Sequence, residues 1–597
     1  MFRRVTNGIT NDRQVPLFRL IWNVLTSRER RGLVGIVVLI FVGMVLELFS
    51  LALVIPAVGL LTQDNYADKY PRIVAFIGDP SGTTLIVGGL ILLFVVYLVK
   101  GGFMLLSVWV QRGFSVAIGI RLRQQMFEHY LSQRYVFHLE NNSAMLIRNV
   151  QNSTSVLTGG VDPFLILLTD GLVAIGMVCV LLVVEPIGTL IVLLLFVAAG
   201  LIFQKTTRAR LARWGEEGNL HSGMALKYLQ EGLGGIKDVK MLGREQKFLD
   251  DHGAHTIATG SISRRYAFMQ TLPRVWLEIL TVGSLAVLVS SLVIQGKPLS
   301  SILPVLGLFA ATAFRVMPSI NKIIASFQTL RYSEPVIRLT YCDLVESRVT
   351  SPIRSGPIGF NSEISFDKVT FNYPNSELVS LKDASLVVNK GETIGIVGSS
   401  GAGKTTLVDI LLGLLEPTSG RVIVDGRDIH ENVQSWQRQI GYVPQSIYLI
   451  DNSLRRNISF GLPDEEIDEE AVRRAVESAQ LGSFISQLPE GLETIVGERG
   501  VRLSGGQRQR IGIARALYAD PSILVLDEAT SSLDGETEKG FLEAISCLKG
   551  TKTIIMVAHR LSTLEQCDRV YRLEDAIIVH EGSLHEVTNV FEWRGRS

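Results

Sequence analysis

Six long apolar stretches in the first 330 residues constrain the fold of this chain more than any other feature. A helix that crosses a membrane needs about 20 mainly apolar residues. The stretches lie at about 33–61, 84–109, 161–184, 187–203, 275–295 and 301–325. Glu185-Pro186 predicts a tight external turn between the third and fourth stretches, and the short fourth helix is expected to continue past Phe203. The sequence therefore predicts an α-helical transmembrane bundle with six spans.

Basic residues are distributed unevenly around these stretches. They are frequent before the first stretch and in the long connections at about 110–160 and 204–274, whereas the short connections hold only Lys69, Arg72 and Lys297. Because Lys and Arg concentrate on the cytoplasmic side of membrane proteins, both termini are expected in the cytoplasm. The long connections are rich in helix formers, which predicts that the membrane helices extend into the cytosol.

Composition excludes some partners and sites. The 597 residues carry a formal net charge of +1, so no overall basic field indicates nucleic acid as a partner. The four cysteines form no CxxC pair and have no histidine at metal-ligand spacing, so we expect free thiols. The Arg-rich N-terminus lacks the pattern of a cleavable signal, and the membrane helices are expected to direct insertion.

The character of the chain changes after the last apolar stretch. A segment rich in Pro, Gly and Ser near 340–360 is typical of a boundary, and alternating strand and helix patterns after it predict a largely parallel sheet. We therefore expect a transmembrane domain with cytoplasmic extensions at 1–335, a linker at 336–362 and an α/β domain at 363–597.

A phosphate-binding loop follows a buried strand of the α/β domain. The strand at 392–397 leads into GSSGAGKTT and then an apolar helix, which matches G-x-x-x-x-G-K-[ST] in the context that it requires. Backbone N–H groups and the helix N-terminus favour phosphate there. Lys404 is expected to neutralise the β- and γ-phosphates of ATP, and Thr405 to bind Mg²⁺. The expected nucleotide contacts are Gly398, Ser399, Ser400, Gly401, Ala402, Gly403, Lys404, Thr405 and Thr406.

Two carboxylates end a downstream strand. The apolar run Ile523–Leu526 precedes Asp527 and Glu528. Asp527 is expected to coordinate Mg²⁺ through water, and Glu528 to polarise the water that attacks the γ-phosphate, because phosphoryl transfer depends mainly on positioning and charge stabilisation. Two adjacent acidic residues, taken alone, usually mark only the solvent-exposed end of a strand. Their position after a buried strand, in a domain with a P-loop, favours the catalytic interpretation.

The segment LSGGQ at Leu503–Gln507 gives the chain its resemblance to ATP-binding cassette (ABC) proteins. The resemblance implies that this segment opens a helix whose N-terminus faces the γ-phosphate bound by a partner subunit. Because one chain holds one P-loop and one such segment, it also implies a homodimer with two composite sites, and ATP and Mg²⁺ as cofactors. The residues that it assigns to nucleotide binding here are Ser504, Gly505, Gly506 and Gln507.

Further residues match the family in its order along the chain. The resemblance implies that Tyr373 in FNYP stacks on adenine and that Gln445 in YVPQ senses Mg²⁺ and the membrane domain. It implies that Asp534 in SSLD bridges the two sites and that His559 in VAHR holds the γ-phosphate. Glu498 in VGERG resembles a loop that contacts the cytoplasmic extensions. No motif position departs from the pattern, so we expect an ATPase competent for hydrolysis and coupled to transport.

Cations near the apolar stretches give the best indication of the cargo. Ionisable groups are costly in hydrocarbon and often functional there, and Lys100, Arg274 and Arg315 lie on three separate stretches. They predict a cavity that attracts phosphate or pyrophosphate, to which Arg offers a bidentate match. In the structural alternative, Arg274 snorkels at the edge of its span and Lys100 pairs with Glu47 or Glu278.

Three further segments sharpen the resemblance. LPRVWLE, FRVMPSINKIIASFQTLRY and VYRLED are similar to lipid-linked oligosaccharide flippases of the PglK type, the exporters of bacterial protein N-glycosylation. This implies flipping of a polyprenyl-pyrophosphate glycan across the bacterial cytoplasmic (inner) membrane, with the lipid bilayer and the glycolipid as partners. Lys100, Arg274 and Arg315 fall where these flippases have basic residues, and lysine at 100 replaces an arginine, so the planar fork is lost.

Other functions stay open on the sequence alone. Export of another amphiphile, such as a glycolipid, a peptide or a hydrophobic drug, would use the same machinery. A soluble regulatory ABC ATPase is disfavoured by the six apolar stretches. An ATP-gated channel is disfavoured because the intact hydrolytic motifs fit an active cycle better.

Overall fold

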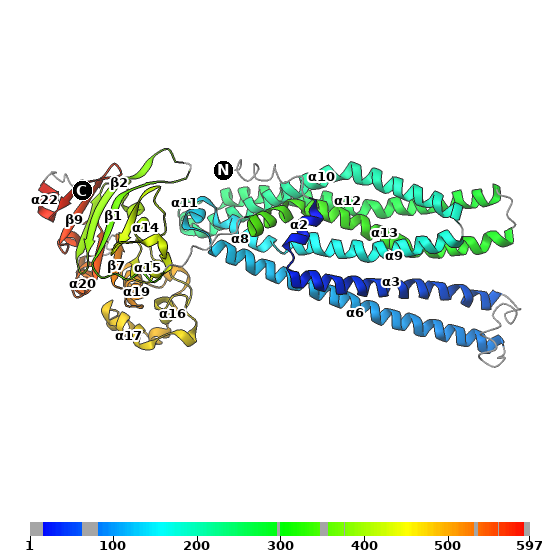
Figure 1. The fold of residues 1–597 in the computed structure, drawn as a ribbon, viewed down its shortest axis with the longest axis horizontal. Helices are drawn as coiled ribbons and strands as arrows, with labels where there is room; N and C mark the ends of the chain where they lie inside the picture. The colour runs from blue at the N-terminus through cyan, green and yellow to red at the C-terminus, as the bar shows by residue number, and fades with distance from the viewer. Residues whose placement is uncertain are drawn as a thin grey trace. The chain divides into compact units, whose positions relative to one another are not determined.

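The computed structural model describes residues 16–62, 82–184, 186–294, 299–346, 356–374, 376–529, 535–558 and 560–589. The chain divides into two compact units, one formed by residues 1–133 with 138–349 and the other by residues 134–137 with 350–597. The first unit is built from helices and the second contains two β-sheets (Figure 1).

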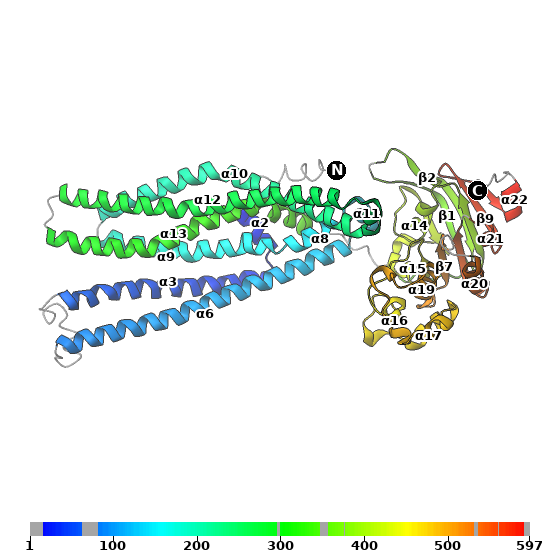
Figure 2. The ribbon, with the colours of Figure 1, turned by 180° about the vertical axis from the view of Figure 1, so that it is seen from behind.

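Long helices form the first unit. In the described residues, those of 23 residues or more are α3 (Ser27–Thr62), α6 (Gly82–Leu131), α9 (Asp162–Val184), α10 (Pro186–Gly234), α12 (Glu245–Ile294) and α13 (Leu299–Tyr341). Shorter helices of this unit are α2 (Leu17–Val24), α8 (Ser143–Asn152) and α11 (Ile236–Leu242), and α7 (Tyr135–Glu140) is divided between the two units. Helices α3 and α6 lie side by side, and α9, α10, α12 and α13 form a second packed group (Figures 1 and 2).

Several expectations for these helices are confirmed. Helix α9 ends at Val184 and α10 begins at Pro186, and α10 continues far beyond Phe203. Polar helical extensions follow the apolar part of α6 and α10 and precede that of α12.

Three stretches of the described residues are long and apolar enough to cross a membrane: Ser27–Ser50, Val87–Leu131 and Thr158–Val180. The other three expected spans fall in α10, α12 and α13. Each of these includes side chains outside the described part of the chain.

Helix α13 ends at Tyr341 and a π-helical turn, η3 (Cys342–Glu346), follows it. Helical structure therefore occupies the first part of the range 336–362 expected as a linker. Residues 347–355 of that range lie outside the described residues.

Two sheets form the second unit. One has the order β2-β1-β4-β5 and is antiparallel; the other has the order β10-β9-β3-β8-β7-β6. In the second sheet only the pairing of β9 with β10 is antiparallel, which confirms the expected largely parallel sheet. The antiparallel sheet was not predicted. The strands are β1 (Glu363–Asn372), β2 (Val379–Asn389), β3 (Thr393–Gly398), β4 (Ser419–Val424), β5 (Arg427–Asp428), β6 (Ile440–Val443), β7 (Ile523–Asp527), β8 (Thr553–Val557), β9 (Arg569–Glu574) and β10 (Ile577–Gly582).

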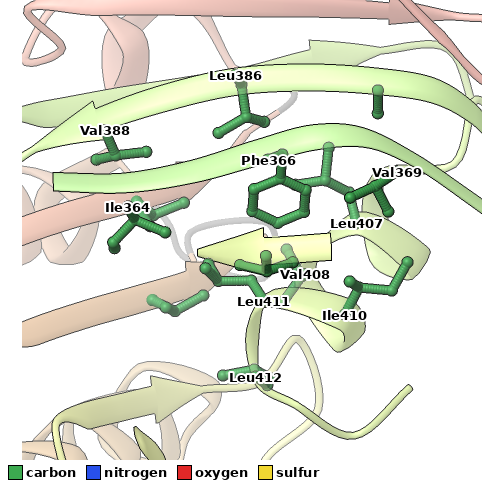
Figure 3. Close-up of a cluster of buried hydrophobic side chains, with 14 of the residues drawn as sticks. Ile364, Phe366, Val369, Leu386, Val388, Leu407, Val408, Ile410, Leu411 and Leu412 are labelled. Carbon is green, nitrogen blue, oxygen red and sulfur yellow. The ribbon is translucent and has the colours of Figure 1, made fainter. Parts of the chain in front are cut away.

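One hydrophobic core lies between the antiparallel sheet and helix α14 (Lys404–Leu411) (Figure 3). Ile364 and Phe366 alternate with exposed or partly exposed neighbours on β1, as the two-residue period of a strand requires. Leu407 and Leu411 contribute from α14, one turn apart. Burial of these side chains fixes the helix that follows the P-loop.

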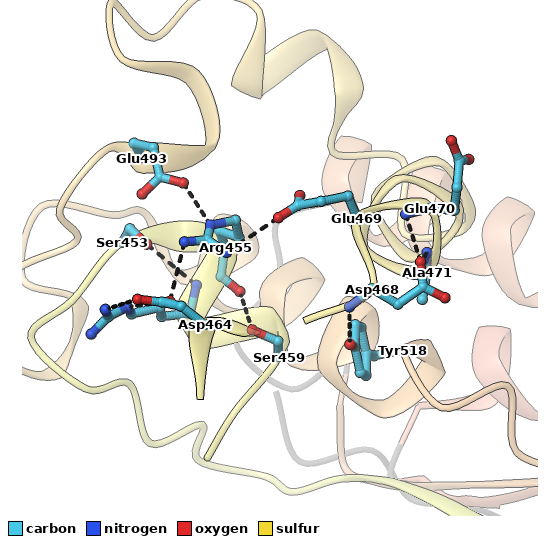
Figure 4. Close-up of polar contacts among 11 residues, drawn as sticks. Ser453, Arg455, Ser459, Asp464, Asp468, Glu469, Glu470, Ala471, Glu493 and Tyr518 are labelled. Atoms are coloured by element: carbon cyan, nitrogen blue, oxygen red, sulfur yellow. Dashed lines mark hydrogen bonds and ion pairs between the residues drawn. The ribbon is translucent and has the colours of Figure 1, made fainter. Parts of the chain in front are cut away.

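A second core joins helices α16 (Leu454–Ile458), α17 (Glu469–Ser478) and α19 (Gly505–Leu517). On its surface the guanidinium of Arg455 donates to Glu493 at 2.6 Å, and to Glu469 and Asp464 at 3.2 Å each (Figure 4). These contacts tie α16 to α17 and to two surface turns. Other α-helices in the described residues of this unit are α15 (Val433–Gln437), α18 (Gly482–Ile485), α20 (Gly535–Ser546), α21 (Leu561–Leu564) and α22 (Leu584–Asn589).

Candidate active site

Parallel strands bring most of the predicted motifs to one edge of the six-stranded sheet. β3 ends at Gly398, β7 at Asp527 and β6 at Val443. The carboxyl ends of parallel strands meet at the same edge, where open α/β sheets bind ligands. The P-loop, the two carboxylates and the segment that carries Gln445 are therefore neighbours.

Glycine is required at two positions of the P-loop. A Cβ atom on Gly403, at φ 101°, would lie 2.5 Å from the carbonyl oxygen of Ser380, and one on Gly398 would lie 2.3 Å from that of Leu573. Such contacts exclude any side chain there. The loop can approach β2 of the antiparallel sheet and β9 of the six-stranded sheet this closely only because these two residues lack a Cβ atom.

The ammonium group of Lys404 lies inside this loop. Its Nζ donates to the carbonyl oxygens of Gly398 and Ser399, both at 3.0 Å. Burial lowers the pKa of Lys404, and the carboxylates of Glu528 and Asp527 oppose this shift. A buried cation at a helix N-terminus favours an anion such as phosphate.

Tyr373 lies beside the helix that follows the P-loop. Its hydroxyl is 3.3 Å from Oγ1 of Thr406, and its ring packs edge-to-face on Phe371 with centroids 5.0 Å apart. The structure therefore places Tyr373 beside Thr406 of the P-loop, whereas its stacking on adenine, which the resemblance implies, stays a prediction.

The carboxylates at the end of β7 have different surroundings. Asp527 is buried, and this burial raises its pKa; the negative charge of Glu528 raises it further. Two groups lower the pKa of Asp527 and partly offset this: the hydroxyl of Tyr442, 3.4 Å away, and the charge of Lys404. Glu528 accepts a hydrogen bond from Nε2 of Gln445 at 2.7 Å. Glu528 also has a φ of 49°, which is uncommon for a residue with a side chain.

Sequence reasoning did not identify Asp409 as part of this cluster. Asp409 is buried on α14, and burial together with the charge of Asp527 raises its pKa to about 6. A polar residue inside the apolar run TLVDILLG is the signal that points to it. The cluster therefore holds a third carboxyl group behind Asp527.

The LSGGQ segment forms a capping box at the start of α19. Oγ of Ser504 accepts from the backbone N–H of Gln507 at 3.2 Å, and Oε1 of Gln507 accepts from the backbone N–H of Ser504 at 2.9 Å. The pattern S-x-x-Q is a known signature of this cap, so this role was readable from the sequence. The side chain of Gln507, predicted to contact nucleotide, supports the helix terminus instead of projecting freely.

The predicted residues are not all brought together in one chain. The P-loop helix belongs to the first core of the second unit and α19 to the second core. Asp534 and His559 lie outside the described residues, as does the side chain of Arg315. Their predicted roles stay predictions.

The other two cations of the predicted cargo cavity are both paired. Nζ of Lys100 on α6 lies 2.9 Å from Oε2 of Glu47 on α3 and 3.0 Å from Oγ of Ser50, so the pairing with Glu47 that the sequence left open is present. Arg274 is exposed and lies 3.4 Å from Glu278, one turn along α12.

The donor groups fit ATP and Mg²⁺. The P-loop offers backbone N–H groups and Lys404, and the buried Asp527 at the strand end suits a cation that relieves its unfavourable burial. The described residues contain no group of three or more His, Cys, Asp or Glu able to hold a metal. Mg²⁺ bound by one or two protein groups together with nucleotide phosphates needs no such group.

Comparisons with known proteins agree with this arrangement. Residues 33–317 match the ABC transporter transmembrane region, and residues 381–531 match the ABC transporter family. The ATP-dependent lipid A-core flippase of Cupriavidus metallidurans is 32% identical over 504 residues, which cover 82% of this chain and 83% of the relative. The same-named protein of Ralstonia nicotianae is 33% identical over 78% and 79% of the two chains.

Two further similarities extend the comparison. The heterocyst differentiation ATP-binding protein HepA of a Nostoc species is 31% identical over 82% of each chain. The structure of a bacterial Atm1-family ABC exporter with ATP bound superposes with a TM-score of 0.78, covering 94% of this chain and 96% of that one, at 23% identity. At this identity, the superposition shows that the two proteins share a fold.

Proposed function

This chain belongs to the ABC exporters as a half-transporter, a membrane ATPase that drives transport, and from that premise we propose that it flips a lipid-linked oligosaccharide across the bacterial cytoplasmic membrane. The cargo would be a polyprenyl-pyrophosphate glycan that moves from the inner to the outer leaflet. Both termini and the ATPase domain would lie in the cytoplasm, as the distribution of Lys and Arg predicts.

One observation supports ATP as the energy source for this transport. The P-loop, the carboxylates after β7 and the segment that carries Gln445 meet at one edge of the six-stranded sheet, whereas the LSGGQ helix belongs to a separate core. Lys404 and the P-loop N–H groups would hold the phosphates, and Tyr373 would support the adenine. Thr405, Asp527 and Gln445 would hold Mg²⁺, which supplies charge neutralisation when bound.

Hydrolysis would depend on groups from two chains. Glu528 would orient and polarise the attacking water, and His559 would hold the γ-phosphate. The N-terminus of α19, with Ser504 at its cap, would face the nucleotide bound to the other subunit, and Asp534 would join the two sites. A homodimer would therefore build two equal sites, and closure of the dimer would move the membrane helices.

Charge near the membrane helices supports the cargo. Arg274 is exposed on α12 and lies beside a carboxylate that it can exchange for a pyrophosphate oxygen. Arg315 lies on α13, and the resemblance to oligosaccharide flippases supports its role. Lys100 is the weakest member of the set, because its ammonium group is engaged with Glu47.

A second cargo has its own support. Relatives named as lipid A-core flippases are more than 30% identical over most of the chain. This supports a lipid cargo and makes a glycolipid without a polyprenyl chain the main alternative.

Reconstituted liposomes test the proposal. The full-length protein is assayed with a polyprenyl-pyrophosphate oligosaccharide, with lipid A-core and with a neutral glycolipid, and Glu528→Gln is the hydrolysis-deficient control. We expect ATP-dependent flipping of the first lipid. Flipping of lipid A-core alone would replace the proposed cargo by the alternative, and flipping of none of the three lipids would reject a lipid-linked cargo.

A further inference from the structure

A pocket lies between two groups of helices in the first unit. It has a volume of about 330 Å³ and is bordered by α3 and α6 on one side and by α9 and α13 on the other. Its apolar lining includes Met44, Phe103, Met104, Leu165 and Ile166. Flexible methionines and an aromatic ring suit an adaptable apolar ligand such as an alkyl chain.

Two ion pairs border the same pocket. Nη1 of Arg112 on α6 is hydrogen-bonded to Asp162 on α9. Nζ of Lys322 on α13 lies 3.4 Å from Oδ1 of Asp170 on α9. Each cation contacts a carboxylate of α9 from another helix. The pair of Arg112 and Asp162 joins the two sides of the pocket, and the pair of Lys322 and Asp170 joins α13 to α9 on one side.

The two signs of charge are not equally accessible. The side chains of Arg112 and Lys322 are 62% and 61% exposed, whereas those of Asp162 and Asp170 are only 15% and 12% exposed. The carboxylates lie recessed behind the cations. A ligand that enters the pocket therefore meets positive charge, although the four groups together are neutral.

The cations also retain unused donors. Among the contacts of the described residues, Arg112 uses one of its five N–H groups on Asp162, and Lys322 uses one of three on Asp170. An anionic headgroup can bind the remaining donors while both ion pairs persist. The recessed carboxylates then hold the cations in place and avoid the cost of an unpaired charge near hydrocarbon.

The position of the charges along the helices indicates an interface. Arg112 follows the apolar stretch at about 84–109, and Asp162 begins the stretch at about 161–184. Beside the pocket, Ile36, Ile40 and Leu165 belong to a hydrophobic core that joins α3, α6 and α9. One end of the pocket, at Arg112 and Asp162, thus lies where the apolar part of the helices meets their polar extensions, the level of lipid headgroups. Asp170 and Lys322 lie within the stretches at about 161–184 and 301–325.

We propose that this pocket binds an anionic amphiphile, with its phosphate on Arg112 and Lys322 and its chain against the methionines and Phe103. The inference rests on the proposed function and places the site where cargo is first captured. The site is additional to Lys100, Arg274 and Arg315, the cations of the predicted cargo cavity.

Equilibrium binding of ³²P-labelled dodecyl phosphate to the full-length protein in phosphatidylcholine nanodiscs tests the site, with unlabelled dodecylphosphocholine as the zwitterionic competitor. The variant Arg112→Gln/Lys322→Gln should weaken binding about tenfold or more, because two charge-assisted hydrogen bonds are lost. Lys247→Gln is the matched control: Lys247 is also exposed and paired with an aspartate, Asp251 at 2.8 Å, but it lies in the polar part of α12.

A charge-neutral carboxylate separates ligand binding from a merely structural role. Asp170→Asn leaves Lys322 without its counter-charge, so dodecyl phosphate should bind more tightly than to the unaltered protein. Equal weakening by Asp170→Asn and by the double variant would show that the ion pairs only hold the helices together, and would overturn the proposal.

Two other results would also overturn it. Binding that the double variant leaves unchanged would exclude the cations as the anion site. Absence of specific binding to the unaltered protein would exclude the pocket as a site for an anionic amphiphile. If the double variant binds dodecyl phosphate as the unaltered protein does, and the unaltered protein flips lipid, this site alone is rejected. If the unaltered protein binds dodecyl phosphate tightly but flips no lipid, the proposed function is rejected and the site is kept.

Discussion

Nε2 of Gln445 donates a hydrogen bond to Oε2 of Glu528 over 2.7 Å. The two residues follow β6 and β7, which are neighbouring parallel strands. The bond holds the proposed catalytic carboxylate and joins it to the segment that the resemblance links with the membrane domain. Movement of Gln445 would therefore change the freedom of Glu528 directly.

Glu528→Gln tests the catalytic role of the carboxylate. The amide keeps the size of the side chain and an oxygen that accepts from Gln445, but loses the charge that polarises water. We expect ATP hydrolysis to fall by about 10²–10⁴-fold while nucleotide binding is retained. Phosphate release and binding of a fluorescent ATP analogue measure the two effects, and hydrolysis within threefold of normal would contradict the assignment.

The backbone of Glu528 supplies a second test. Its φ of 49° is strained for any residue with a Cβ atom and relaxed for glycine. Glu528→Gly and Glu528→Ala should both be inactive, yet the glycine variant should be more stable by about 1 kcal/mol. Thermal unfolding of the purified full-length variants measures this difference. Equal stability would mean that the conformation is not strained.

Two substitutions of Ser504, the N-cap of α19, distinguish an effect on folding from an effect on phosphate recognition. Ser504→Ala removes the oxygen that caps Gln507 N–H and should cost about 1 kcal/mol. Ser504→Asp restores a good N-cap but places a negative charge where the partner's γ-phosphate is proposed to bind. Both variants should lose ATPase activity, but only the alanine variant should melt earlier. An active Ser504→Asp protein would remove α19 from the composite site.

Much of this site followed from the sequence because its motifs are local. The P-loop, the acids after β7 and the LSGGQ segment each need only a strand end or a helix start, which short patterns encode. The meeting of the P-loop and the two acids at one edge follows from parallel strand pairing, whereas the LSGGQ segment belongs to the second core. The capping box of Ser504 and Gln507 was equally readable but was not predicted.

Other features depend on contacts between distant segments. The antiparallel sheet pairs β1 with β4, whose residues lie between 49 (Thr370 to Ser419) and 60 (Ile364 to Val424) positions further along the chain, and no local pattern fixes that partner. The choice of Glu47 over Glu278 by Lys100 depends on α3 packing against α6. Asp409 joins the carboxylate cluster only because α14 packs beside β7.

Asp425 predicts a pH effect on the fold. It lies in the turn after β4 at φ 48°, and its carboxylate accepts from the backbone N–H groups of Asn361, Ser362 and Glu363 at 2.6–3.0 Å. Slight burial tends to raise the pKa of Asp425, but these hydrogen bonds and the charge of Lys390 outweigh it, so the pKa is lowered. The stabilisation is therefore present above the ordinary pKa of about 3.9 and is lost as pH falls through the lowered value.

Asp425→Asn is the matched variant, since asparagine tolerates this backbone conformation. It should lower the melting temperature of the full-length protein at pH 7 by a few degrees at most, because the site is exposed. The difference from the unaltered protein should shrink as pH is lowered toward 3. A difference that is independent of pH would show that the charge of Asp425 has no role.

The buried pair of Lys100 and Glu47 decides whether Lys100 acts on cargo or on the fold. Lys100→Met removes the ammonium group that faces the buried carboxylate of Glu47, which costs about 3–5 kcal/mol, whereas replacing both charges is often neutral. Glu47→Gln/Lys100→Met should therefore recover the melting temperature that the single variant loses. Because the ammonium is already engaged with Glu47 and Ser50, we also expect the double variant to recover ATP-dependent lipid flipping in liposomes. A double variant that is as stable as the unaltered protein and still transports no lipid would instead return Lys100 to the cargo site, as the resemblance to oligosaccharide flippases implies.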